Sequence, residues 1–191
     1  MNTIKSIKRI EFEEKKSKFI GHIKPVSTKK EAEEYIAEIK NKYKDATHNC
    51  SAYKLIENGQ EYFKVDDDGE PKGTSGKPMG EILTYMEIDN VVVIATRYFG
   101  GIKLGAGGLV RAYAKTAKLA VQASEIIEYI KKEIYLLEFN YDKVSEIDKL
   151  ICNHDNILEK GFNDKVFYKV QLSDENLEKI KKLRNISIIK L

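Results

Sequence analysis

The sequence predicts a mixed α/β (α+β) fold divided into two domains, residues 1–126 and 127–191. Three observations support this prediction. A β-branched run at 91–96 leads into a glycine-rich loop and a helix, and after residue 126 the pattern changes to short strands and helices in the order βαββαβ. That order is typical of a ferredoxin-like sandwich. A chain of 191 residues, 42% of them hydrophobic, can bury one medium core or two small ones.

The first domain is predicted to begin with a hairpin of two strands, residues 4–13 and 18–26. Thr28-x-x-Glu31 then resembles a capping box that opens a helix. The apolar face of this helix would comprise Ala32, Tyr35, Ile36, Ile39 and Tyr43.

Two further strands, 47–56 and 60–65, are predicted across the turn Glu57-Asn58-Gly59-Gln60. Residues 66–78 form a loop, and a short helix at 78–87 begins near Pro78 because proline is favoured in the first turn of a helix.

Residues 91–96 (VVVIAT) lack polar alternation, which favours a strand covered on both faces. The glycines that follow allow the backbone to take positive φ and to approach a ligand closely. A helix is expected from Leu109 to about Ser124, with Leu109, Tyr113, Ala117 and Ala120 on its buried stripe.

The second domain is predicted to hold a strand from 126 to about 139, a helix at 142–153, strands at 156–162 and 165–172, a helix at 174–184 and a strand at 186–190. Core positions include Val144, Ile147 and Ile151 on one helix and Leu177, Ile180 and Leu183 on the other.

Positive charge is concentrated beside the glycines. No acidic residue lies between Asp89 and Glu125, and residues 127–191 hold 12 basic and 12 acidic residues, so the net charge of +3 lies in the first domain. Glycines ahead of a helix expose backbone N–H groups that suit an anion. The segment carries five cations, Arg97, Lys103, Arg111, Lys115 and Lys118, of which the last three share one helical stripe.

Neither common nucleotide motif fits. A P-loop would need lysine and a hydroxyl after Gly105, where the chain has Ala106-Gly107, and a dinucleotide fingerprint would need glycine at Val110. Two interpretations therefore stay open: an anion-facing loop without a nucleotide signature, or a tight strand-to-helix turn with solvated lysines.

Four segments together resemble the YigZ/IMPACT family over essentially the whole chain. They are KSKFI at 16–20, ATHNCSAY at 46–53, DDGEPKGTSGKP at 67–78 and RYFGGIKLGAGGLVR at 97–111. The resemblance implies an N-terminal domain with the fold shared by a small-subunit ribosomal protein, elongation factor G domain IV and the GHMP kinases. It also implies a ferredoxin-like C-terminal domain similar to the last domain of elongation factor G, and an association with translation.

Two functional hypotheses follow. In the preferred one the chain is a binding protein whose glycine loop, basic helix stripe and C-terminal sheet contact structured RNA or the ribosome. Three aromatic residues beside the cations, Tyr98, Phe99 and Tyr113, could stack on bases, but Phe99 and Tyr113 are expected in the core. The anion-binding residues would be Arg97, Tyr98, Gly100, Gly101, Lys103, Gly105, Gly107, Gly108, Arg111 and Lys115.

The alternative is an enzyme that acts on a small phosphorylated or carboxylated metabolite held by the same loop. His48, Asp67 or Glu70 would then transfer protons, with Asn49 as a further polar residue of the cleft. His48 and Cys50 share one face of a strand, so they form either a thiolate pair or a buried thiol beside a bracing histidine.

No metal and no cofactor is expected. The acidic loop Asp66-Asp67-Asp68-Gly69-Glu70 lacks the outer EF-hand ligands, since Lys64 and Ser75 stand at those positions, and pairing with the basic segment is the preferred interpretation. The charged N-terminal stretch indicates neither a signal peptide nor a membrane anchor. Cys50 and Cys152 are expected as reduced thiols in the cytoplasm.

Overall fold

The computed structural model describes residues 1–57, 59–130, 132–151 and 155–191. These form two compact units, Met1–Tyr129 and Ile130–Leu191. Helices and antiparallel sheets in both units confirm the mixed α/β class. The boundary suggested by the sequence, residue 126, lies inside strand β7 (Ile126–Glu128), which pairs with β1 (Asn2–Ile4) of the first unit.

The first unit is built on a five-stranded antiparallel sheet with the order β2-β3-β6-β4-β5. The sequence predicts these strands to within a few residues, except that the expected strand 4–13 is divided into β1 and β2. Position 58 of the predicted turn lies outside the described residues. The five strands are β2 (Lys8–Glu14), β3 (Ser17–Pro25), β6 (Val91–Tyr98), β4 (His48–Glu57) and β5 (Gln60–Asp66).

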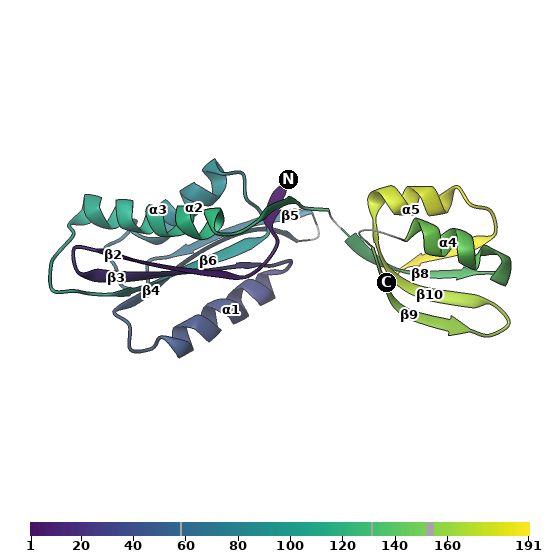
Figure 1. Ribbon diagram of the computed structural model, residues 1–191, viewed down its shortest axis with the longest axis horizontal. Helices are drawn as coiled ribbons and strands as arrows, with labels where there is room; N and C mark the ends of the chain where they lie inside the picture. The colour runs from purple at the N-terminus through teal and green to yellow at the C-terminus, as the bar shows by residue number, and fades with distance from the viewer. Residues whose placement is uncertain (58, 131, 152–154) are drawn as a thin grey trace. The chain divides into compact units, whose positions relative to one another are not determined.

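Helices cover both faces of this sheet (Figure 1). Helix α1 (Lys29–Lys42) lies on one face, and α2 (Gly76–Tyr85) and α3 (Ala106–Gln122) lie on the other. Strand β6 is buried along residues 91–97, as its unbroken apolar run predicts. The capping box is confirmed in part, because Thr28 Oγ1 accepts a hydrogen bond from Glu31 N at 3.1 Å.

The two cores follow from the alternation of side chains along β6. Val92 and Ile94 pack with the apolar stripe of α1, whereas Val91, Val93 and Ala95 pack under α2 and α3. A sheet sandwiched in this way holds its central strand rigidly, so groups at the ends of β6 have fixed positions.

The second unit has the order β11-β8-β10-β9, with every neighbouring pair antiparallel. This order confirms the predicted ferredoxin-like topology. The expected strand 126–139 is instead two strands. The expected helix 142–153 is a 3₁₀ turn followed by α4, and residues 152–153 lie outside the described residues. The elements are β8 (Lys132–Phe139), the turn Tyr141–Lys143, α4 (Val144–Leu150), β9 (Asn156–Phe162), β10 (Val166–Ser173), α5 (Asp174–Lys181) and β11 (Ile186–Lys190).

Within the described part of the chain, no helix has both the length and the apolar character needed to cross a membrane.

Candidate nucleic-acid interface and the buried cluster beside it

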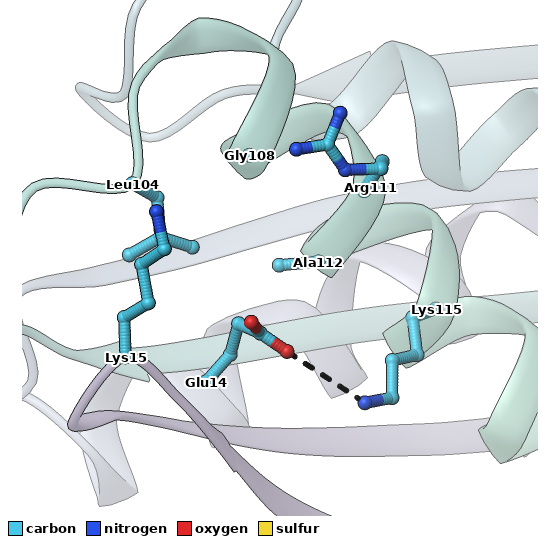
Figure 2. A pocket seen from close by; sticks show the side chains of 7 residues that line it. All are labelled: Glu14, Lys15, Leu104, Gly108, Arg111, Ala112 and Lys115. Carbon is cyan, nitrogen blue, oxygen red and sulfur yellow. Dashed lines mark ion pairs between the residues drawn. The ribbon is translucent and has the colours of Figure 1, made fainter.

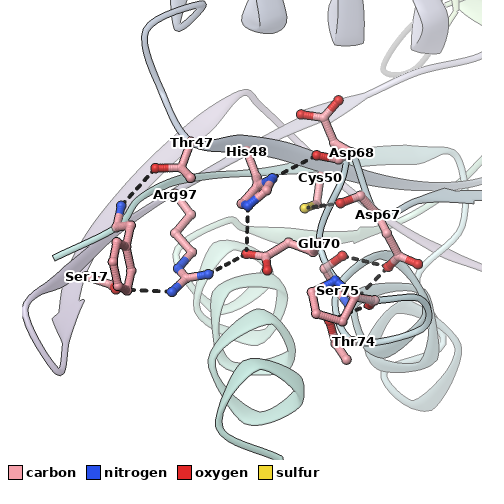
Figure 3. Close-up of polar contacts among 12 residues, drawn as sticks. Ser17, Thr47, His48, Cys50, Asp67, Asp68, Glu70, Thr74, Ser75 and Arg97 are labelled. Carbon is pink, nitrogen blue, oxygen red and sulfur yellow. Dashed lines mark hydrogen bonds and ion pairs between the residues drawn. The ribbon is translucent and has the colours of Figure 1, made fainter. Parts of the chain in front are cut away.

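Segments far apart in the sequence meet at one end of the first sheet. Strand pairing places Arg97 of β6 opposite His48 of β4 and Phe19 of β3. The loop after β5 brings Asp67 and Glu70 to the same end (Figure 3). Residues from four sequence segments therefore form one polar cluster.

A buried ion pair lies at the centre of this cluster. Arg97 Nη1 donates to Glu70 Oε1 at 2.6 Å, and Tyr113 Oη donates to the same oxygen at 2.7 Å. Arg97 Nη2 is 3.4 Å from Ser17 Oγ. Arg97 therefore does not lie among the exposed cations, because its strand is covered on both faces and the acidic loop supplies its counter-charge. The pair confirms the expected contact between the acidic loop and the basic segment.

Asp67 braces the loop that carries Glu70. Its carboxylate accepts hydrogen bonds from Ser75 Oγ (2.6 Å) and from three backbone N–H groups, that of Gly73 in the loop and those of Ser75 and Gly76 at the start of α2. Burial acts to raise the pKa of Asp67, but these hydrogen bonds outweigh it and the pKa is lowered. Because both carboxylate oxygens accept these hydrogen bonds, Asp67 stabilises the loop and is not placed to transfer a proton.

The same loop also makes hydrogen bonds with His48, Asn49 and Cys50 of β4. His48 Nδ1 is 2.8 Å from the Asp68 carbonyl oxygen, and the Asn49 amide N–H donates to Asp68 Oδ2 at 2.6 Å. Cys50 Sγ donates to the Asp67 carbonyl oxygen at 3.0 Å. Burial raises the pKa of the Cys50 thiol to about 12, so the thiolate pair with His48 is not formed near neutral pH.

Four exposed cations define what we call the α3 basic surface: Lys15, Lys103, Arg111 and Lys115. Three of them, Lys15, Arg111 and Lys115, line a pocket of about 250 Å³ (Figure 2). Glu14 lies in the same pocket, 3.9 Å from Lys115 Nζ. The remaining lining residues are Leu104, Gly108 and Ala112.

Helix α3 begins at Ala106, earlier than the predicted Leu109, so Gly107 and Gly108 lie in its first turn. Gly105 occupies the N-cap with φ of 73°, a conformation that favours glycine. No side chain caps this end and no acidic residue lies in the first turn. The first N–H groups of the helix thus lack intrahelical partners and carry partial positive charge beside Arg111.

Lys15 and Lys16 form the two-residue turn between β2 and β3, with φ of 47° and 63°. Turns of this kind normally contain Asn-Gly, because other side chains are strained at positive φ. The turn packs against the glycine loop so closely that a Cβ atom on Gly100 would overlap the Lys16 carbonyl group. Sequence reasoning missed Lys15, although two lysines in a tight turn are the signal that could have identified it.

The aromatic residues beside the cations take different positions. Tyr113 is buried, as expected, and Tyr98 Oη lies 3.1 Å from Asp45 Oδ1. Phe99 is 46% exposed, so its expected place in the core is wrong. The reason is that β6 ends at Tyr98, and Phe99 follows it outside the sheet.

Among the described residues, no group of three or more His, Cys, Asp or Glu side chains is arranged to hold a metal ion. The groups that could hold a ligand are the cations and backbone amides of the α3 basic surface, and these suit an anion.

The fold and this surface define a class: two-unit α/β proteins whose first unit carries a basic glycine loop. Residues 15–121 match the family model of the Impact N-terminal domain. The chain is 42% identical to IMPACT family member YvyE of Bacillus subtilis over 146 residues, which cover 76% of this chain and 67% of that protein. The chain belongs to the IMPACT family.

Other relatives extend the similarity through the second unit. An IMPACT family member of Haemophilus influenzae is 32% identical over 178 residues, covering 91% of this chain and 85% of that protein. IMPACT family member YigZ of Escherichia coli is 30% identical, covering 83% and 78%. A crystal structure described as a hypothetical protein, 24% identical, has a TM-score of 0.67 and covers 100% of this chain and 96% of that one, which indicates a shared fold.

Proposed function

We propose that this protein binds RNA, free or within the ribosome, through the α3 basic surface, as part of a role in translation. The observation that carries the proposal is that Lys15, Arg111 and Lys115, from two separate elements, line one pocket together with Gly108 of the uncapped first turn of α3. Lys15 comes from a hairpin turn, and Arg111 and Lys115 come from α3. Lys103 is exposed on the glycine loop that leads into this helix. The family resemblance supports the link to translation, and such a role would be carried out in the cytoplasm.

The chemistry of the surface suits the phosphates of RNA. Arg111 offers a planar guanidinium for two parallel hydrogen bonds to one phosphate, and Lys15 and Lys115 act as point charges. The amides of Gly107 and Gly108 add donors without side-chain bulk. A bound phosphate would replace Glu14 as the partner of Lys115, because their separation of 3.9 Å in exposed surroundings is a weak ion pair.

The residues proposed for the interface therefore divide into two groups. Lys103, Arg111 and Lys115 would contact phosphates, joined by Lys15. Arg97 and Tyr98 would instead hold the strand end in place, and Gly100, Gly101 and Gly105 would shape the loop.

A small phosphorylated or carboxylated metabolite is a second candidate ligand, because the pocket of about 250 Å³ has room for one. The described residues that line this pocket do not include His48, Asp67 or Glu70, the side chains suggested for proton transfer. Thermal unfolding measured with a panel of metabolites tests this candidate, since a ligand that binds only the folded state raises Tm.

Co-sedimentation with ribosomes and with total RNA, over a series of salt concentrations, tests the proposal. Release of counterions should make binding fall steeply as salt rises. Absence of binding at every salt concentration would contradict the proposal and favour the small anion.

A further inference from the structure

We infer that the α3 basic surface takes unpaired RNA and that Phe99 is the platform on which one base stacks. This inference rests on the proposed function, and it names the class of RNA that the surface selects. Phe99 is apolar, yet 46% of its surface area is exposed to solvent.

The ring of Phe99 is held in a defined place. The guanidinium of Arg97 lies over the ring, with Cζ 5.6 Å from the ring centroid. That guanidinium is itself fixed by Glu70 and Ser17, and Phe99 N donates to Thr47 Oγ1 at 2.9 Å. One side of the ring is thus supported by a buried cation while the residue remains half-exposed, so little side-chain freedom is lost when a base stacks on it.

The platform is continuous with the cations. Gly100, the next residue after Phe99, packs against the backbone of Lys16. Lys15, the other residue of that turn, lines the pocket with Arg111 and Lys115. A strand whose phosphates lie on these cations can therefore place a base at Phe99.

An exposed aromatic ring beside cations distinguishes between classes of RNA. In an A-form duplex the bases are stacked on each other and the major groove is too deep and narrow for side chains, so a protein ring cannot stack on them. An unpaired base has a free π-face, and proteins that bind single strands combine a basic groove with aromatic platforms. Phosphate contacts alone would select neither form.

Fluorescence anisotropy with an RNA of about 12 nucleotides, presented as a single strand and as a duplex, tests the inference. Parent protein should bind the single strand more tightly. Phe99→Leu should weaken single-strand binding between about fivefold and a hundredfold, with an unchanged salt dependence, because it removes stacking and no charge. Phe99→Tyr should retain affinity, and duplex binding should be the same in all three proteins.

The result that overturns the inference is single-strand binding by Phe99→Leu equal to that of the parent, or equal binding of both RNA forms by the parent. If Arg111→Glu/Lys115→Glu then still loses binding, the proposed function stands and only the stacking platform is rejected. Absence of RNA binding by the parent protein would reject both. Thermal unfolding of Phe99→Leu verifies that the variant is folded.

Discussion

Arg97 Nη1 lies 2.6 Å from Glu70 Oε1, and the two side chains are 6% and 3% exposed. This pair joins the acidic loop after β5 to the end of β6. It explains why Arg97, the first cation of the basic segment, is absent from the exposed basic surface. A buried ion pair adds little net stability compared with apolar residues, but removal of one partner leaves an uncompensated buried charge.

Glu70→Gln is therefore expected to lower the free energy of unfolding by about 3 kcal/mol, since Arg97 then lacks its counter-charge. Urea unfolding of the full chain measures this change. The matched control is Glu81→Gln, whose carboxylate on α2 is 64% exposed, and which should change stability by no more than about 0.5 kcal/mol. Similar stability of the two variants would contradict the structural role assigned to Glu70.

The turn Lys15-Lys16 has positive φ at both residues, so we expect one double substitution to stabilise the protein and weaken its binding to RNA. Lys15→Asn/Lys16→Gly should raise the free energy of unfolding by about 1 kcal/mol, because asparagine and glycine tolerate the positive φ of this turn. The same variant should bind RNA more weakly and with a shallower salt dependence, because two cations are removed. A variant that is more stable and binds as tightly as the parent would exclude the turn from the interface.

The buried His22 should make the free energy of unfolding depend on pH. Burial lowers its pKa from 6.5 to about 4, and Nε2 lies 3.3 Å from Thr96 Oγ1. Between these two pH values the unfolded chain binds a proton that the folded protein does not, so stability falls as the pH drops from 6.5 towards 4. Above 6.5 His22 makes no contribution to the pH dependence. His22→Gln should show a shallower fall across this window in urea unfolding, and an unchanged slope would contradict the assignment.

Cys50 is expected to resist alkylation in the folded protein. With a pKa of about 12, only about 10⁻⁴ of the thiol is ionised at a pH near 8, and the side chain is buried. Iodoacetamide labelling of the Cys152→Ser variant, followed by mass spectrometry, isolates this residue. Labelling should proceed only after unfolding in urea, and rapid labelling of the native protein would restore Cys50 as a candidate nucleophile.

The fold could be predicted from the sequence because its signals are local. The unbroken apolar run of β6 indicates a strand covered on both faces, and the βαββαβ pattern fixes the topology of the second unit. The split of the strand expected at 4–13 was not foreseen, because the pairing of β1 with β7 joins opposite ends of the first unit.

The site was only partly predictable, because exposure depends on contacts between distant segments. Arg97 and Arg111 look alike in the sequence. Arg97 is buried because its strand is covered on both faces and Glu70 pairs with it, whereas Arg111 is exposed on α3. Lys15 joins the pocket through the fold of a hairpin, and Phe99 is exposed because the strand ends one residue earlier.

The most direct measurement is the equilibrium affinity for a single-stranded RNA over a salt series, for the parent, Arg111→Glu/Lys115→Glu and Lys29→Glu/Lys30→Glu. The control pair changes the net charge equally on α1, which covers the opposite face of the sheet. Four phosphate contacts predict a slope of log affinity against log salt of about −3 for the parent and the control, and about −1.5 for the α3 variant. Equal slopes and affinities in all three proteins would contradict binding at the α3 basic surface.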